Sequence, residues 1–472
     1  MPLCYLYLIP LLLIKAMGFV SSSVVYKVVF VIAFCISGVI FLISKDAIKL
    51  KIIRLSMVMM LAISCFLSRT YSLLLLAGLI MCIPMDFNYK KFYKTACMTW
   101  WIGIALAFAM LLTPLRTDTV TVFGRQILGI IEYRHSFGYA HANDFGATIV
   151  IGLILSVLAI GDRLEWKKML IFDIIELVFF CINWSFTSLG VFVLLEILLL
   201  ITSFGRSGSS KALSLLCVFP PLTIIGLVFL YNPRCAIWRW MDILFTGRLF
   251  LAQKLRLIHD IPMLGQIIEP QIGIQDIAYM NILYTFGLIP SILILLLYVI
   301  ALHRWMTRGQ LVEIIVCFCF LTYGVTEQFF RNCFMNISLM MVVSETLGSA
   351  SEKQSGASPK EKNYLDGHIY RCNAIACIAM FFVIISICTI IVGGFAKYRR
   401  FVTADRDILA IYYARNEEEN AQWEEVRQLS YEIKKTRTTD PLLYDAKLNE
   451  FCEAWDELVF LNSFSNAEFA AI

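Results

Sequence analysis

The chain has 472 residues, of which 59% are hydrophobic and only 16% are charged, and its formal net charge is +5. Soluble domains carry about 25% charged residues, so this composition excludes a soluble protein and indicates a polytopic membrane protein. The small net charge gives no sign of a nucleic-acid partner. The 15 cysteines show neither metal-ligand spacing nor a disulfide framework. We therefore predict no metal site and no cofactor.

The apolar runs along the chain have the length that a helix needs to cross a bilayer. The first run lacks a basic leader and a cleavage site, which predicts a membrane helix rather than a signal peptide. The pattern predicts an all-α bundle of about 12–13 transmembrane helices. We place the runs near residues 3–19, 24–43, 53–67, 71–84, 95–112, 143–160, 169–182, 189–201, 213–231, 281–302, 311–325, 335–347 and 374–393.

Basic residues of the short loops predict how the bundle is oriented, because cytoplasmic loops carry an excess of lysine and arginine. Basic loops alternate along the runs in the way that this rule requires, which places the N-terminus in the cytoplasm. Two long connections, 114–138 and 232–280, then fall on the outer face. The basic loops hold Lys45, Lys49, Lys51, Arg54, Lys90, Lys91, Lys94, Arg163, Lys167, Lys168, Arg206, Lys211, His303, Arg304, Arg308, Lys353, Lys360 and Lys362.

The two outer connections should be poor in positive charge, yet they hold seven arginines and, apart from Lys254, almost no lysine. Arginine binds phosphate or carboxylate through a planar fork and stays charged when partly desolvated. Snorkelling to the headgroups accounts for the arginines next to span ends, such as Arg116 and Arg234. It accounts less well for Arg125, Arg134 and Arg248, and these three favour an anion-binding site.

The connection 232–280 is amphipathic, with aromatic and aliphatic residues interleaved with charged ones over 238–259. This pattern predicts interfacial helices that cover the outer mouth of the bundle. We divide the chain into a membrane domain, 1–394, and a charged, soluble helical tail, 395–472. The helix count places the tail outside, whereas Lys397, Arg399 and Arg400 favour the cytoplasm.

A polar stretch stands out between the apolar runs: Arg134-x-Ser136-Phe137-Gly138-Tyr139-x-His141-Ala142-Asn143-x-Phe145-Gly146. It resembles the R-x-S-x-G-[FY]-x-H-P-N-x-x-G signature of Wzy-type polysaccharide polymerases, which share a superfamily with the O-antigen ligases. Ala142 stands where proline is usual. Further blocks resemble the family in the same order between about residues 50 and 345: Thr246-Gly247-Arg248, Leu264-Gly265-Gln266, 276–289 and the pair Glu327 and Asn332.

The resemblance implies an enzyme of the bacterial plasma (inner) membrane that polymerises undecaprenyl-diphosphate-linked oligosaccharide units into capsule, exopolysaccharide or O-antigen. The expected partners are these lipid-linked oligosaccharides, the lipid bilayer, and the flippase and chain-length regulator of the same pathway. Such a glycosyltransferase needs cations at its diphosphate leaving group, a role we assign to Arg125, Arg134 and Arg248. The outer loops show no paired aspartates of the D-x-D kind, which is consistent with a metal-free site.

The acceptor hydroxyl needs a base, and the related ligases use a histidine of the large outer loop. This chain has Asp276 at the matching block, so Asp276 is our first candidate and His259 the second. We add Glu327 to the catalytic set as a carboxyl near the membrane that pairs with Arg331 or a site arginine. The remaining candidates for substrate binding are His141, Asn143 and Tyr279, and either His141 or Asn143 alternatively caps the helix that starts at Asn143.

Three other functions remain open. An O-antigen ligase of the same superfamily would transfer a finished chain, and the motifs barely separate it from a polymerase. A transporter or flippase of lipid-linked sugars would suit the helix count, although the sequence shows no clear repeat and its polar groups gather at the outer face rather than the midplane. A scaffold protein of a capsule assembly machine is the third.

Overall fold

The structure is a computed structural model of the full chain. It describes residues 3–348, apart from short gaps, and part of the C-terminal tail. The gaps are residues 85–86, 114, 126–129, 162–163, 205–208, 233–236, 239–240, 243–244, 246 and 270–275, and the described residues of the tail are 418, 421–433, 443 and 445–458.

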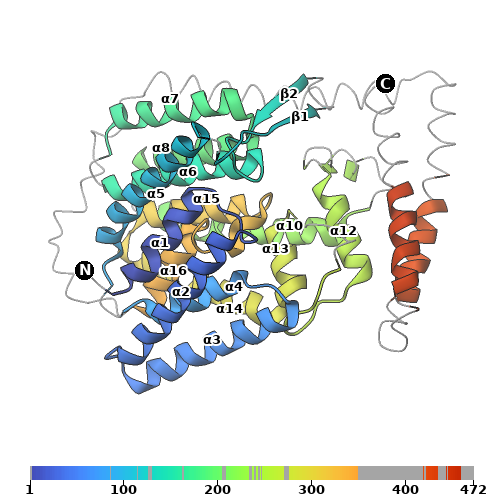
Figure 1. Ribbon diagram of the computed structural model, residues 1–472, viewed down its shortest axis with the longest axis horizontal. Helices are drawn as coiled ribbons and strands as arrows, with labels where there is room; N and C mark the ends of the chain where they lie inside the picture. The colour runs from blue at the N-terminus through green and yellow to red at the C-terminus, as the bar shows by residue number, and fades with distance from the viewer. Residues whose placement is uncertain are drawn as a thin grey trace.

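The N-terminal half consists of helices that run back and forth along one direction, interrupted by one β-hairpin (Figure 1). The elements are α1 (Tyr5–Ala16), α2 (Val24–Ile43), α3 (Ile48–Ser68), α4 (Ser72–Cys82), α5 (Tyr89–Leu111), β1 (Val120–Arg125), β2 (Ile130–His135), α6 (Ala142–Ile160), α7 (Trp166–Asn183) and α8 (Phe186–Phe204).

The C-terminal half continues the bundle and adds shorter helices at one end of it (Figure 1). The elements are α9 (Ser209–Leu216), α10 (Phe219–Leu230), α12 (Arg248–Ile258), α13 (Ala278–Asn281), the π-helical turn η3 (Ile282–Phe286), α14 (Leu288–Arg308), α15 (Leu311–Tyr323), the 3-10 turn η4 (Gln328–Arg331) and α16 (Ile337–Leu347).

The chain is an all-α, multi-pass membrane protein, as predicted. Among the described residues, six helices are long and apolar enough to cross a bilayer: Val24–Ile43, Ile48–Ser68, Tyr89–Leu111, Ala142–Ile160, Leu213–Leu230 and Leu288–Arg308. Five shorter apolar helices accompany them among the described residues: Tyr5–Ala16, Ser72–Cys82, Phe186–Thr202, Leu311–Tyr323 and Ile337–Leu347. Each predicted run up to 335–347 falls on helical segments, although 213–231 covers parts of α9 and α10 and 281–302 is interrupted. The last run, 374–393, lies outside the described residues.

The helices divide into a centre and a lipid-facing periphery. In α6, 78% of the most apolar window is buried inside the protein, against 22% in α2. The outward residues of α2 are nonetheless apolar: Val24 and Leu42 are both 75% exposed. A surface of this kind suits hydrocarbon rather than water, because lipid tails are as apolar as leucine.

Two local features differ from the sequence prediction. The connection 114–138 contains the antiparallel hairpin β1–β2, in which Thr121 pairs with Arg134 and Arg125 with Ile130. The run 281–302, predicted as one helix, is interrupted by η3 and Gly287 before α14 begins. The interruption fits a close contact: the Phe286 carbonyl accepts a hydrogen bond from Ser64 of α3 at 2.7 Å instead of bonding only within a helix.

The two ends of the bundle are chemically different. At one end, the buried Arg54 bonds to Asp46 at 2.8 Å and to the carbonyl of Leu347 at 3.1 Å. Arg308 meets Glu345 there at 2.9 Å. We call this the basic end, and the positive-inside rule predicts that it faces the cytoplasm. The opposite end holds the hairpin, α12 and the turn between α15 and α16, and we call it the site end (Figure 1).

Candidate functional site

A network of polar side chains joins four separate segments at the site end. Its centre is Glu327, which follows α15 and has 11% of its side chain exposed. One carboxylate oxygen, Oε1, accepts a hydrogen bond from Asn143 Nδ2 at 3.1 Å and lies 3.4 Å from an Arg248 nitrogen. Arg248 Nε also lies 3.5 Å from an oxygen of Asp276. Residues that are far apart in the sequence therefore share one carboxylate.

The second arginine of the network is Arg134, which β2 brings to the start of α6. Its guanidinium donates to the side-chain oxygen of Asn143 and, through Nε, to the carbonyl of Asn183 at 3.2 Å. The residue is only 6% exposed. Asn143 thus accepts from Arg134 with its oxygen and donates to Glu327 with its nitrogen. This single amide links Arg134 and Arg248, two of the three predicted anion-binding arginines, through the carboxylate of Glu327.

The rest of the polar stretch folds the turn that carries these groups. Gly138 has φ of 74°, a left-handed conformation that glycine adopts without strain. Ser136 bonds to Thr119 across the hairpin base at 2.6 Å, and the Tyr139 hydroxyl donates to the Ala16 carbonyl at 2.5 Å. The stretch therefore contains two kinds of residue: those that build the turn and those that face the network.

The N-cap of α6 is His141 and not Asn143. Nδ1 of His141 accepts a hydrogen bond from the backbone N–H of Asn143 at 3.1 Å, and His141 has the extended backbone typical of a cap. This finding corrects the capping alternative for Asn143, whose side chain is engaged by Arg134 and Glu327 instead. It also gives His141 a structural role in the turn.

Arg248 is positioned by the start of α12. The preceding Gly247 adopts a left-handed backbone with φ of 79°, so the helix begins abruptly at the arginine. The buried carboxylate of Asp242 accepts hydrogen bonds from the N–H groups of Leu249 and Phe250 at 2.9 and 3.1 Å. Asp242 thus satisfies amides that a helix start leaves without partners. Thr246, the first residue of the T-G-R block, lies outside the described residues.

Burial sets the protonation of Glu327. It raises the pKa of this carboxyl to about 7; the Arg248 guanidinium opposes the rise, and the negative charges of Asp276 and Asp144 add to it. A carboxyl with a pKa near neutrality can accept and release a proton under physiological conditions. Together, the network offers two guanidinium groups for an anion and a titratable group between them.

Asp276, the first candidate base, is brought to the network through Arg248, and 41% of its side chain is exposed. His259, the second candidate base, lies away from the network. It ends α12, eleven residues after Arg248, which corresponds to about 16 Å along a helix. Its ring is buried, with Nε2 2.9 Å from an oxygen of Glu269.

The contacts described for Tyr279, Arg331 and Arg125 are with residues outside the network. The Tyr279 hydroxyl donates to the Leu321 carbonyl at 2.5 Å, and its ring lies against Phe330, so the contacts seen are packing contacts. Arg331 bonds to Asn281 at 2.5 Å rather than pairing with Glu327. Arg125 pairs with Ile130, four residue pairs, or roughly 13 Å, along the hairpin from Arg134.

Sequence reasoning missed Asn183, whose hydrogen bonds join α7 to β2 and to the start of α6. This residue ends α7 and is 1% exposed. Its side-chain nitrogen donates to the carbonyls of His135 at 3.0 Å and Ala142 at 2.6 Å, and its own carbonyl accepts from Arg134. The only sequence signal was an asparagine at the end of an apolar run, a pattern that usually marks a helix end.

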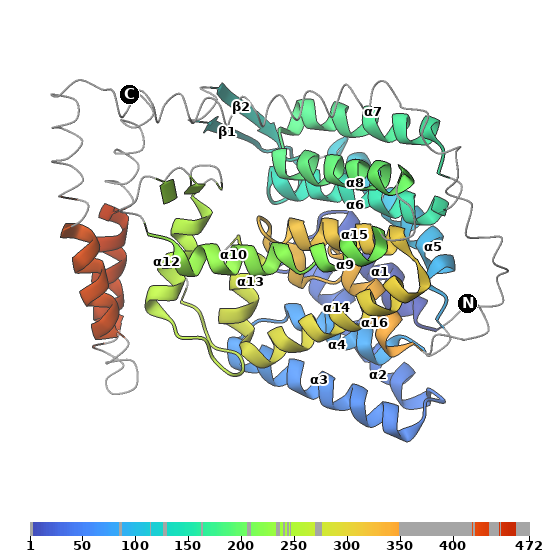
Figure 2. The ribbon, with the colours of Figure 1, turned by 180° about the vertical axis from the view of Figure 1, so that it is seen from behind.

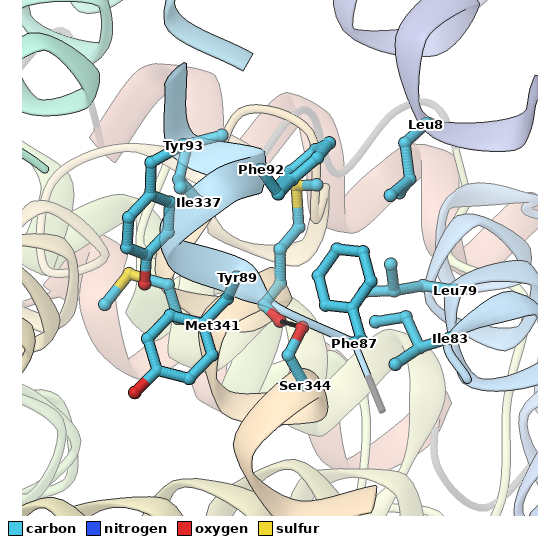
Figure 3. A pocket seen from close by; sticks show the side chains of 11 residues that line it. Leu8, Leu79, Ile83, Phe87, Tyr89, Phe92, Tyr93, Ile337, Met341 and Ser344 are labelled. Atoms are coloured by element: carbon cyan, nitrogen blue, oxygen red, sulfur yellow. Dashed lines mark hydrogen bonds between the residues drawn. The ribbon is translucent and has the colours of Figure 1, made fainter. Parts of the chain in front are cut away.

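An apolar pocket lies elsewhere, among α1, α4, α5 and α16 (Figure 3). Phe87, Phe92 and Met341 are among the side chains that line it, and Ser344 donates to the Met340 carbonyl at 2.6 Å. Its lining offers no charged group for a diphosphate. Among the described residues, no group of three or more histidine, cysteine, aspartate or glutamate side chains is placed to hold a metal ion.

Comparisons of this chain with protein-family models, with curated proteins and with solved structures found no significant match. The case for a function therefore depends on the residues of the network and on the end of the membrane bundle where they lie.

Proposed function

We propose that the protein is a polysaccharide polymerase that joins lipid-diphosphate-linked oligosaccharide units at the outer face of a bacterial inner membrane. One observation carries the proposal: Arg134 and Arg248, which come from the two outer connections, are linked through Asn143 and Glu327 at the end of the bundle opposite the basic loops. A transmembrane scaffold that gathers arginines at one mouth suits a substrate whose lipid stays in the bilayer and whose diphosphate sits at its surface.

The chemistry that we assign to the network is glycosyl transfer. A hydroxyl oxygen of the acceptor sugar attacks the anomeric carbon of the donor, a new C–O bond forms, and the bond from that carbon to the diphosphate oxygen breaks. The electron pair of the broken bond leaves with the diphosphate, whose added charge Arg134 and Arg248 stabilise. The proton of the hydroxyl passes to Glu327, since its pKa lies near 7.

This assignment changes the order of the candidate bases. Asp276 was the first candidate from its sequence position, yet its exposed carboxylate faces Arg248. Glu327 is more deeply buried and lies between the two arginines. A base in that position is close to both the departing charge and the incoming hydroxyl, so we place Glu327 first and Asp276 second.

The test compares Arg248→Ala with a matched control on the same helix. Arg256 lies two turns further along α12 and contacts the carbonyl of Phe229 at 3.0 Å instead of Glu327. The measurement is the length distribution of lipid-linked glycans in cells that contain equal amounts of each protein. We expect Arg248→Ala and Arg134→Ala to leave single repeat units and Arg256→Ala to make long chains.

Other results separate the alternatives. Long lipid-linked chains that accumulate in Arg248→Ala would identify a ligase, because polymerisation would then occur without this residue. An outer leaflet without lipid-linked units would identify a transporter. Normal polymer in both arginine variants would remove the diphosphate role of the network.

A further inference from the structure

The described helices of the C-terminal tail pack against α12. Figures 1 and 2 show them, in red, beside α12 in both views. The ring of Trp455 stacks on Phe250 with centroids 4.6 Å apart, and Trp423 lies 6.4 Å from the same ring. Ser430 donates a hydrogen bond to the carbonyl of Leu257. The contact thus extends along α12 from its first turn to its last.

This contact is a buried core rather than a surface encounter. Trp455 is 1% exposed, and Phe250 and Trp423 are 4% and 6% exposed. The ammonium of Lys254 lies 5.8 Å from the centroid of the Trp455 ring, a cation–π arrangement that is worth more when water is excluded. Aromatic residues of both segments form one hydrophobic cluster with α10 and α12. Large aromatic contacts of this kind dominate the energy of interfaces.

The position of α12 fixes the side of the membrane on which the tail lies. α16 ends at the basic end, where Glu345 meets Arg308 and Leu347 meets Arg54. α12 begins at the site end, where Arg248 meets Glu327. The described tail helices therefore lie at the opposite end of the bundle from the end of α16. Between residues 348 and 421 the sequence contains one apolar run that is long enough to cross a membrane, 374–393.

We propose that the C-terminal helices lie on the outer face and hold α12, so that Trp455 is a positioning residue for Arg248. Phe250, on which Trp455 stacks, is two residues from Arg248 in the first turn of α12. The contacts place the tail at the site end, which the positive-inside rule makes the outer one, whereas the effect on Arg248 rests on the proposed function. Of the two placements of the tail that the sequence left open, the contacts favour the one given by the helix count.

The first experiment tests the location without any assay of activity. Single cysteines are introduced into a cysteine-free chain at Asn449, an exposed residue of the tail, at Val122 on the hairpin and at Lys49 in a basic loop. A membrane-impermeant maleimide is then applied to intact cells. We expect Asn449→Cys and Val122→Cys to react and Lys49→Cys to react only after permeabilisation. A tail that behaves like Lys49→Cys would overturn the proposal.

The second experiment tests the contact by proteolysis of the native-sequence chain and its variants. Lys254 is buried beneath Trp455, at 6% exposure, so trypsin added from outside should not cleave after it. Trp455→Ala should expose this bond, and Trp455→Phe, which keeps an aromatic ring, should protect it. Cleavage that is equal in all three proteins would show that the tail does not cover α12.

The same variants test positioning. We expect Trp455→Ala to lower the rate of polymer formation by about tenfold or more at unchanged protein level, because small misplacements of a binding group reduce turnover strongly. Trp455→Phe should restore most of the rate. Wild-type turnover in Trp455→Ala, with Lys254 newly cleaved, would refute the positioning role and leave the outer location in place. If no variant or wild-type protein forms polymer, the proposed function fails while labelling and proteolysis still decide the location.

Discussion

Replacing Glu327 by glutamine tests the central group of the network. The amide keeps an oxygen that can accept from Asn143 and Arg248, so the geometry is largely retained, but the group no longer titrates. Because burial raises the pKa of Glu327 to about 7, its ionised fraction is about tenfold larger at pH 8 than at pH 6. A carboxyl with the ordinary value of 4.5 would be ionised throughout this range.

The expected result is a pH profile that changes shape. Polymer formation from purified lipid-linked units should rise about tenfold in the wild type between about pH 6 and 8, since only the ionised carboxyl accepts a proton. Glu327→Gln should be slower by roughly 10²-fold or more and flat over the same range. Glu165→Gln, at an exposed glutamate that pairs with Lys168, is the control and should match the wild type. A wild-type profile without a midpoint near 7, or a variant that keeps it, would refute the reasoning.

Three further predictions concern the surroundings of the network. Asp276→Asn removes a negative charge that raises the pKa of Glu327, so the midpoint of the pH profile should move below 7; an upward shift, or complete loss of activity, would contradict this. Asn183→Ala leaves two carbonyls without their donor and should lower stability in a thermal unfolding assay by about 2–4 kcal/mol. The control Asn88→Ala removes only the N-cap of α5 and should cost about 1 kcal/mol. Equal losses in the two variants would count against the role of Asn183. A Cβ at Gly265 would lie 2.1 Å from the Ser64 carbonyl oxygen, so Gly265→Ala should sharply reduce the yield of folded protein. Gly38 has open space around it, so the control Gly38→Ala should fold at the wild-type yield. Equal yields of the two variants would refute this contact.

Most of the bundle could be predicted because the bounds of a helix follow from its own apolar run and from the residues at its two ends. The run 24–43 agrees with α2 residue for residue, since Ser23 caps its start and Lys45 lies just past its end. The hairpin could not be predicted in the same way. Val120 and Val122 alternate with polar residues over one short segment, and both are largely exposed, so no buried face marks the strand.

The site was predictable in its residue types and less so in its partners. The shortage of lysine in the outer connections singled out Arg125, Arg134 and Arg248. The structure joins Arg248 directly, and Arg134 through Asn143, to the carboxylate of Glu327. The contact of Asn143 with Glu327 spans 184 residues and depends on how α6 and α15 pack, which no local pattern records. Asn143 also shows why a capping residue is hard to name in advance: an asparagine at a helix start is a common cap, and here the histidine two positions earlier takes that role.

The buried Arg54 has a consequence for how the chain is made. Its bond to the Leu347 carbonyl joins residues that are 293 positions apart, and at ribosomal rates this separation corresponds to about 15–60 s of synthesis. Throughout that time the guanidinium would be a charge at the edge of the membrane without its final acceptor. Asp46, eight residues earlier and already synthesised, can neutralise it at once. The Asp46–Arg54 pair would therefore compensate the charge between α2 and α3 before α16 is synthesised.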